Sequence, residues 1–139
     1  MNDDLHDFAQ FMQQREAAAQ AYVRGDAKPL GQLVTHELPA TFFGPHGGYR
    51  QNADVFATYE SDAAVFAQGS ETHFEIPHMA ARDGVAYWVG FQKATAYLQG
   101  QAAAIPMNLR VTEVFRREAG IWKLVHRHAD MLAVEEEKK

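Results

Sequence analysis

The chain has 139 residues, 47% of them hydrophobic and 22% charged, a composition typical of one folded domain and not of a disordered segment. A formal net charge of −5 offers no broad basic surface, so we expect neither nucleic acid nor a membrane as a partner. The absence of cysteine excludes a catalytic thiol, and with an acidic start and no apolar run of about 20 residues it favours a cytoplasmic protein.

The first half of the chain predicts three helices. Apolar residues at helical spacing predict helices over residues 5–24, 26–35 and 52–68. A short strand is expected over residues 40–43, followed by a turn-rich segment at 44–48. The long first helix has an apolar stripe that needs a sheet to cover it.

The second half predicts two long hairpins. Residues 74–98 alternate and are rich in aromatic and β-branched side chains, with Asp83 and Gly84 as a two-residue turn. Residues 105–132 form a second hairpin across the turn at 118–120. Helices followed by an antiparallel meander indicate a single α+β domain spanning residues 1–139, with its core at about 5–132.

Side-chain alternation then assigns faces to the strands. If Arg82 pairs with Val85 across the turn, Glu75 lies opposite Gln92 on one face. Both faces of the sheet carry large apolar groups, and helices can cover only one of them, so we expect a homodimer through the outer face. The residues expected at that interface are Trp122, His126, His128, Tyr87 and Phe91.

The order of elements resembles the nuclear transport factor 2-like superfamily. Residues 110–128 are similar to the terminal hairpin of SnoaL-like and ketosteroid isomerase-like proteins. They also resemble the association domain of calcium/calmodulin-dependent protein kinase, with a tryptophan followed by His126 and His128. The resemblance implies a cystatin-like cone, in which three helices pack on a curved antiparallel sheet around a pocket. The superfamily contains enzymes, binding proteins and assembly domains, so the fold alone does not give the reaction.

Steroid isomerase chemistry is not carried over by this resemblance. Those enzymes use a tyrosine, a carboxylate base and a protonated aspartate in the pocket. The matching positions here are Ala18, Gly44 and the vicinity of Val111, and none of them supplies the required group.

The candidate site is a polar row inside an aromatic pocket. The resemblance to the kinase domain places Gln92, Glu113 and Arg127 toward the pocket, and strand alternation adds Glu75. Glu113 or Glu75 is a candidate general base with Arg127 as electrostatic partner, or Glu113 and Arg127 form a structural ion pair. The expected pocket walls are Phe42, Phe115, Trp88, Met12, Tyr22 and Tyr59, with His46 at the mouth.

Two other motifs suggest a binding site but also have a simpler interpretation. His126 and His128 point the same way on a strand and suggest a metal site with Asp130, but an interface pair is the simpler interpretation, and we expect no metal. The glycine-rich segment 44–48 suggests an anion-binding loop, although a plain turn explains it.

The functional prediction is a pocket that binds a small apolar or mixed-polarity molecule. One version is a cofactor-free isomerase, cyclase or dehydratase that uses a pocket carboxylate. The alternative is a non-catalytic ligand-binding or dimerisation domain.

Overall fold

The computed structural model describes residues 3–37, 39–45 and 47–132. Its three helices are α1 (Asp4–Tyr22), α2 (Lys28–Leu33) and α3 (Ala53–Ala63). Its six strands are β1 (Thr41–Phe43), β2 (Tyr49–Gln51), β3 (Glu71–Arg82), β4 (Val85–Ala96), β5 (Ile105–Glu118) and β6 (Ile121–Met131). The predicted helices and both long hairpins are confirmed, whereas the short, exposed strand β2 was not predicted.

The strands form one sheet in the order β2-β1-β6-β5-β4-β3. All neighbours are antiparallel except β1 and β6, which pair in parallel. The antiparallel sheet predicted from the two long hairpins is confirmed for β3 to β6, and the parallel pairing of β1 with β6 makes the complete sheet mixed. β1 reaches its place beside β6 from helix α2 rather than through a hairpin, so no turn sets its direction.

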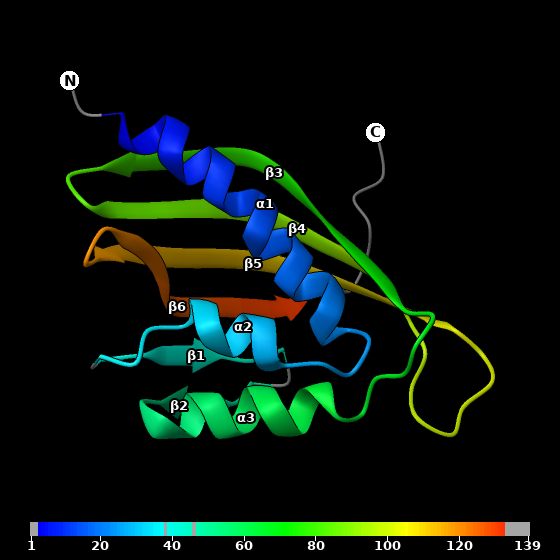
Figure 1. Ribbon diagram of the computed structural model, residues 1–139. Coiled ribbons are helices and arrows are strands. Elements are labelled where there is room, and N and C mark those ends of the chain that lie inside the picture. The colour runs from blue at the N-terminus through cyan, green and yellow to red at the C-terminus, as the bar shows by residue number, and fades with distance from the viewer. Residues whose placement is uncertain (1–2, 38, 46, 133–139) are drawn as a thin grey trace.

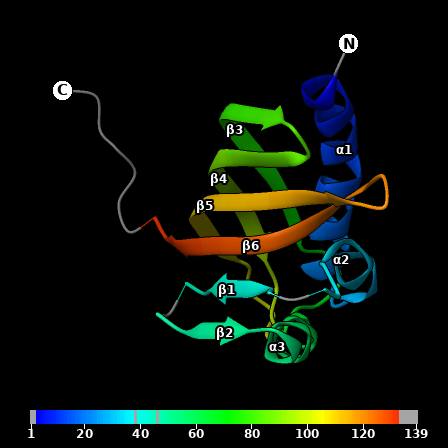
Figure 2. The ribbon, with the colours of Figure 1, turned by 90° about the vertical axis from the view of Figure 1, so that its left-hand side faces the viewer.

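The helices lie together on one face of the curved sheet. Figure 1 shows α1 running obliquely across the long strands, with α2 and α3 beside β1 and β2. Figure 2, turned by 90°, shows that the opposite face of the long strands carries no helix. Within the described ranges, no helix is both long and apolar enough to cross a membrane.

Polar side chains of α1 fix this helix along the edge strand β3. The Phe74 amide donates to Glu16 Oε2 at 2.7 Å, and the Thr72 amide donates to Gln20 Oε1 at 2.9 Å. These bonds occupy backbone groups that an edge strand would otherwise expose. They also hold α1 so that the neighbouring Arg15 is buried toward the sheet.

A β-bulge in β3 corrects the predicted position of Glu75. Near the turn the register is as predicted, but between Glu75 and His78 it shifts by one residue, so that Phe74 lies opposite Gln92. Gly90 permits the bulge, because a Cβ at this position would lie 2.1 Å from the Glu75 carbonyl oxygen. Glu75 therefore faces outward, with its Oε2 3.3 Å from Nε2 of His73, and does not point into the predicted pocket.

A second bulge corrects the position of Trp122. Val114 pairs with His126 while Phe115 pairs with Leu124, so one residue of β6 is inserted and alternation reverses there. Trp122 consequently lies on the inner face, only 3% exposed, with its ring 5.5 Å from that of Phe8. It belongs to the core and not to an outer interface, whereas His126 stays on the outer face.

Candidate functional site

A cavity of about 460 Å³ lies between the helices and the inner face of the sheet. Its walls come from the second half of α1, from α2 and α3, and from parts of β1, β4, β5 and β6. The polar or ionisable residues that line it are Arg15, Tyr22, Tyr59, Asp62, Gln92 and Arg127. The apolar lining residues are Ala19, Val23, Leu30, Phe42, Pro45, Val65, Phe66, Ala94, Ala96, Leu98, Ile105, Pro106, Met107, Leu109 and Met131. A volume in this range suits a small organic molecule.

Behind one wall of the cavity, Glu113 accepts hydrogen bonds from three side chains. Arg15 donates through Nε to Oε1 at 2.9 Å and through Nη2 to Oε2 at 2.6 Å. Arg127 Nη1 donates to Oε2 at 2.6 Å, and Trp88 Nε1 donates to Oε1 at 2.9 Å. A carboxylate has about four acceptor positions, so these four donors fill it.

The same contacts keep Glu113 ionised. Burial favours the neutral acid, but the positive charges of Arg15 and Arg127 and their hydrogen bonds outweigh it and lower the pKa of Glu113 to about 2. A general base needs a pKa closer to the working pH and a free lone pair. Glu113 is therefore the anionic centre of an ion-pair network and is not placed to take up a proton.

Arg127 carries the network onward into the cavity wall. Its Nη2 donates to Gln92 Oε1 at 2.7 Å, and Gln92 Nε2 donates to Thr72 Oγ1 at 3.2 Å. Thr72 in turn donates to the carbonyl of Lys93 at 3.0 Å. Because each group is held by the next, Arg127 and Gln92 present fixed polar groups to the cavity.

Two tyrosines add hydroxyl groups to the same cavity. Tyr22 comes from α1 and Tyr59 from α3, with ring centroids 6.2 Å apart. Burial raises the pKa of both phenols. Each therefore remains a neutral hydroxyl at physiological pH, able to donate a hydrogen bond to a ligand.

Five of the predicted site residues line the cavity, namely Arg127, Gln92, Phe42, Tyr22 and Tyr59. Glu113 lies behind the wall in the ion-pair network, and Glu75 faces outward.

Three predicted wall residues, Trp88, Phe115 and Met12, lie in the packed core and not among the residues that line the cavity. The reason is visible for Phe115, which packs against Phe8 and Phe11 at ring distances of 5.0 and 5.5 Å. That end of the molecule is closed by aromatic side chains. His46 lies outside the described residues.

Arg15 is the site residue that sequence reasoning missed. The helix is predicted from its apolar residues alone, and Arg15 does not enter the predicted site. Arg15 nevertheless lies three residues after Met12 and four before Ala19, which places it on the buried stripe. A basic residue within an apolar helical stripe is the signal that indicates a buried acidic partner.

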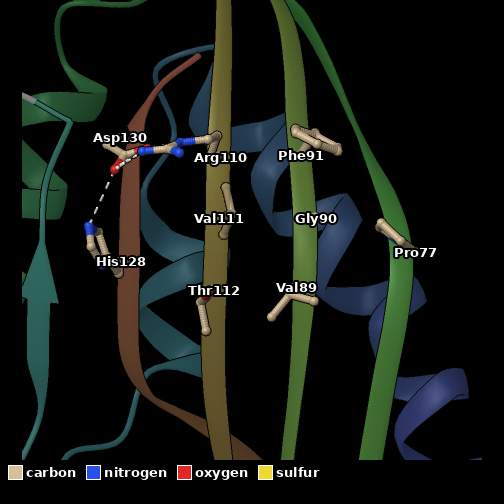
Figure 3. A pocket seen from close by; sticks show the side chains of 9 residues that line it. All are labelled: Pro77, Val89, Gly90, Phe91, Arg110, Val111, Thr112, His128 and Asp130. Atoms are coloured by element: carbon tan, nitrogen blue, oxygen red, sulfur yellow. Dashed lines mark hydrogen bonds and ion pairs between the residues drawn. The ribbon is translucent and has the colours of Figure 1, made fainter. Parts of the chain in front are cut away.

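A second hollow, of about 420 Å³, lies on the outer face of the sheet. Figure 3 shows its lining residues on β3, β4, β5 and β6, with the side chains of Val89 and Phe91 on either side of Gly90. At one side Arg110 donates to both oxygens of Asp130, at 2.7 and 2.9 Å. This hollow is shallower and more open than the inner cavity.

The two histidines of β6 each lie close to another polar side chain. His126 Nδ1 lies 2.7 Å from Thr41 Oγ1, and His128 Nε2 lies 3.6 Å from Asp130 Oδ2. Burial, followed by the neighbouring His128, lowers the pKa of His126. In the part of the chain that the structure describes, no three potential ligand side chains are grouped to hold a metal ion.

The glycine-rich segment forms a turn through its own backbone. The Gly44 amide donates to the Gly48 carbonyl at 3.0 Å, and the Gly47 amide donates to the Gly44 carbonyl at 3.1 Å. These two amides are used inside the loop and are not offered to an anion, so the turn interpretation fits.

Comparison with known proteins gives one family and many similar structures. A model of the SnoaL-like domain family matches residues 12–133. No curated protein matches the chain.

Three solved structures illustrate the likeness of fold. A proposed dehydratase from the NTF2-like family of Streptomyces avermitilis is 20% identical with a TM-score of 0.75, and the match covers 93% of this chain and 98% of that one. An NTF2-like superfamily protein from Salmonella enterica serovar Typhimurium is 14% identical, with a TM-score of 0.77 and coverages of 94% and 92%. The association domain of CaMKII from C. elegans is 16% identical, with a TM-score of 0.71 and coverages of 94% and 100%.

Proposed function

The chain belongs to the SnoaL-like domain family, whose model matches most of its length, and on this basis we propose that it binds a small organic molecule in the inner cavity. The observation that carries the proposal is the composition of the cavity wall. Aromatic and aliphatic side chains cover most of it, and a few fixed polar groups converge on one side. Apolar walls supply affinity and placed polar groups supply orientation, as in most small-molecule sites.

The first experiment is to look for a molecule in the cavity of the untreated protein. Native mass spectrometry and a high-resolution crystal structure should show a bound compound, or binding of added compounds that shift the NMR signals of Tyr22 and Tyr59. A cavity that stays empty with every compound tested would contradict the proposal.

A pair of alanine variants makes this test specific. Ala94 lines the cavity, and Ala94→Leu should fill part of it and weaken binding. Ala80 lies on the outer face opposite Tyr87, so Ala80→Leu is the matched control and should leave binding unchanged. Equal effects of the two substitutions would place the ligand elsewhere.

A cofactor-free isomerase, cyclase or dehydratase is the second candidate function. Its support is the fold shared with a proposed dehydratase. Since Glu113 is fully hydrogen-bonded and Glu75 faces outward, the base would have to be Asp62, the carboxylate among the cavity-lining residues described. Loss of turnover in Asp62→Asn, with ligand binding retained, would support an enzyme.

We also propose that two copies associate through the outer face of the sheet. Apolar side chains remain exposed there, among them Tyr87 at 37% and Phe43 at 39%. Helices leave this face open, and a second copy would bury such a patch. Dimerisation could serve ligand binding or assembly alone, and a cytoplasmic location stays a prediction.

A further inference from the structure

The charges at the polar side of the cavity do not balance. Arg15 and Arg127 are both buried, with side chains 2% and 9% exposed, and both pair with the single carboxylate of Glu113. The remaining partner of Arg127 is the neutral Gln92. The cluster of Arg15, Arg127 and Glu113 therefore carries a net charge of +1.

The donors of this cluster also outnumber its acceptors. Each guanidinium has five N–H groups, whereas the four acceptor positions of Glu113 are already filled. Among the described residues, Nη1 of Arg15 has no hydrogen-bond partner. A buried cation with unused donors is costly unless an acceptor, preferably an anion, is brought to it.

Asp62 is the carboxylate among the described cavity-lining residues, and it differs from the cluster in its exposure to solvent. It lies at the end of α3 and is exposed, whereas the cation cluster is buried. Water and salt screen an exposed charge much more than a buried one. The excess positive charge is thus left facing the cavity interior.

The opposite side of the cavity is apolar. Phe66, Leu98, Ile105 and Met107 line it toward the end of α1 and the connection between β4 and β5. A molecule that fills the cavity would therefore place a polar group at Arg127 and an apolar body against these side chains.

We infer that the ligand is an organic acid, whose carboxylate is bound by Arg127 together with Gln92 and the hydroxyl of Tyr59, and whose apolar body fills the rest of the cavity. This inference rests on the proposed ligand-binding function and specifies its ligand class. Charge-assisted hydrogen bonds are stronger than neutral ones, so the negative charge itself should matter.

The test compares an acid with its uncharged isostere. Isothermal titration calorimetry at pH 7 is carried out with naphthalene-2-carboxylate and naphthalene-2-carboxamide, which share one apolar body. We expect the carboxylate to bind at least about tenfold more tightly, the difference between a charged and a neutral hydrogen bond.

Three variants assign the preference to the cation cluster. Gln92→Glu adds a carboxylate beside Arg127 with almost no change in shape, and should remove the preference for the acid. Gln14→Glu makes the same change at an exposed position of α1 outside the cavity lining, and should keep the preference. Glu75→Gln removes a half-exposed charge outside the cavity lining and should alter the ratio by less than about threefold, because solvent screens that position.

The outcomes separate this inference from the function on which it rests. Equal binding of acid and amide would overturn the organic-acid inference while leaving a small-molecule site intact. No binding of either probe in the millimolar range would overturn the inference and count against the cavity as a site. If Gln92→Glu does not fold, the comparison of the two probes on the native protein decides.

Discussion

Arg15 of α1 and Glu113 of β5, 98 residues apart in the chain, form a two-point ion pair with N–O distances of 2.9 and 2.6 Å. The pair joins the long helix to the middle of the sheet, since Glu113 lies opposite both Trp88 of β4 and Arg127 of β6. A two-point contact between a planar guanidinium and a planar carboxylate restricts their relative orientation. The contact therefore fixes the position of α1 above the sheet, and with it the width of the cavity.

Replacing Glu113 by glutamine should destabilise the fold strongly. The substitution leaves two guanidinium groups buried without a carboxylate, and breaking a buried pair in this way costs about 3–5 kcal/mol. Urea denaturation should show this as a lower midpoint with an unchanged slope.

Glu75→Gln is the matched control for this variant. Its carboxylate is half exposed and faces His73, so the change in unfolding free energy should stay within about 0.5 kcal/mol. If the two variants were equally stable, the role assigned to the Glu113 network would be wrong.

The stability of the protein should depend on pH in part through the ionisation of Glu113. Its pKa is about 2 in the folded protein against an ordinary value of 4.5, so its stabilisation is complete above about pH 4.5 and is lost as the pH falls toward 2. The loss is on the order of 3 kcal/mol.

Other carboxyl groups with lowered pKa, such as Asp130 under the hydrogen bonds of Arg110, also contribute to acid unfolding. The informative quantity is therefore the difference between native protein and Glu113→Gln, measured by thermal unfolding from pH 7 to pH 3. The gap between the two should narrow as the pH falls. A constant gap would mean that Glu113 is not ionised in the fold.

The fold was largely predictable from the sequence because its signals are local. Helical spacing over residues 5–24 and the turn at Asp83 and Gly84 depend on neighbours only, and both were confirmed. The faces of the strands depend on register along the whole strand. A single inserted residue moves every later side chain to the other face, and for this reason Glu75 and Trp122 were misplaced.

The site was predicted only in part, for a related reason. Gln92 and Arg127 were found through a resemblance, which transfers positions on a shared fold. The partner that decides the charge of the site, Arg15, lies on another element, and its pairing with Glu113 is a tertiary contact without a spacing rule. Phe115 and Met12 were predicted as wall residues but lie in the core. Aromatic and thioether side chains occur both in cores and in pocket walls, so the residue type alone does not distinguish the two locations.

Among the glycines without a positive φ angle, Gly90 should be the one whose substitution destabilises the fold most. A Cβ there would lie 2.1 Å from the Glu75 carbonyl oxygen and 2.8 Å from Pro77 Cδ, both parts of the bulge in β3. Gly90→Ala should therefore lower the unfolding free energy by about 2–3 kcal/mol, as overpacking does.

Gly31→Ala is the matched control, because no atom lies within 4 Å of the added methyl group. Gly31 is inside α2, where alanine is favoured, so this variant should be as stable as the native protein or up to about 1 kcal/mol more stable. Chemical denaturation of both variants checks the pair. A neutral Gly90→Ala would show that the bulge can relax at little cost.

A charge placed in the middle of the outer face should separate the two copies of the proposed dimer. Val89 lines the outer hollow there, between His78 and Thr112 on the neighbouring strands. In Val89→Asp, two carboxylates would be buried in a symmetric interface, so the variant should sediment as a folded monomer at concentrations where the native protein is dimeric. Leu5→Asp adds the same charge at an exposed apolar position on α1 and should leave the dimer intact. A native protein that sediments as a monomer would contradict the proposed interface, and so would a Val89→Asp variant that remains dimeric.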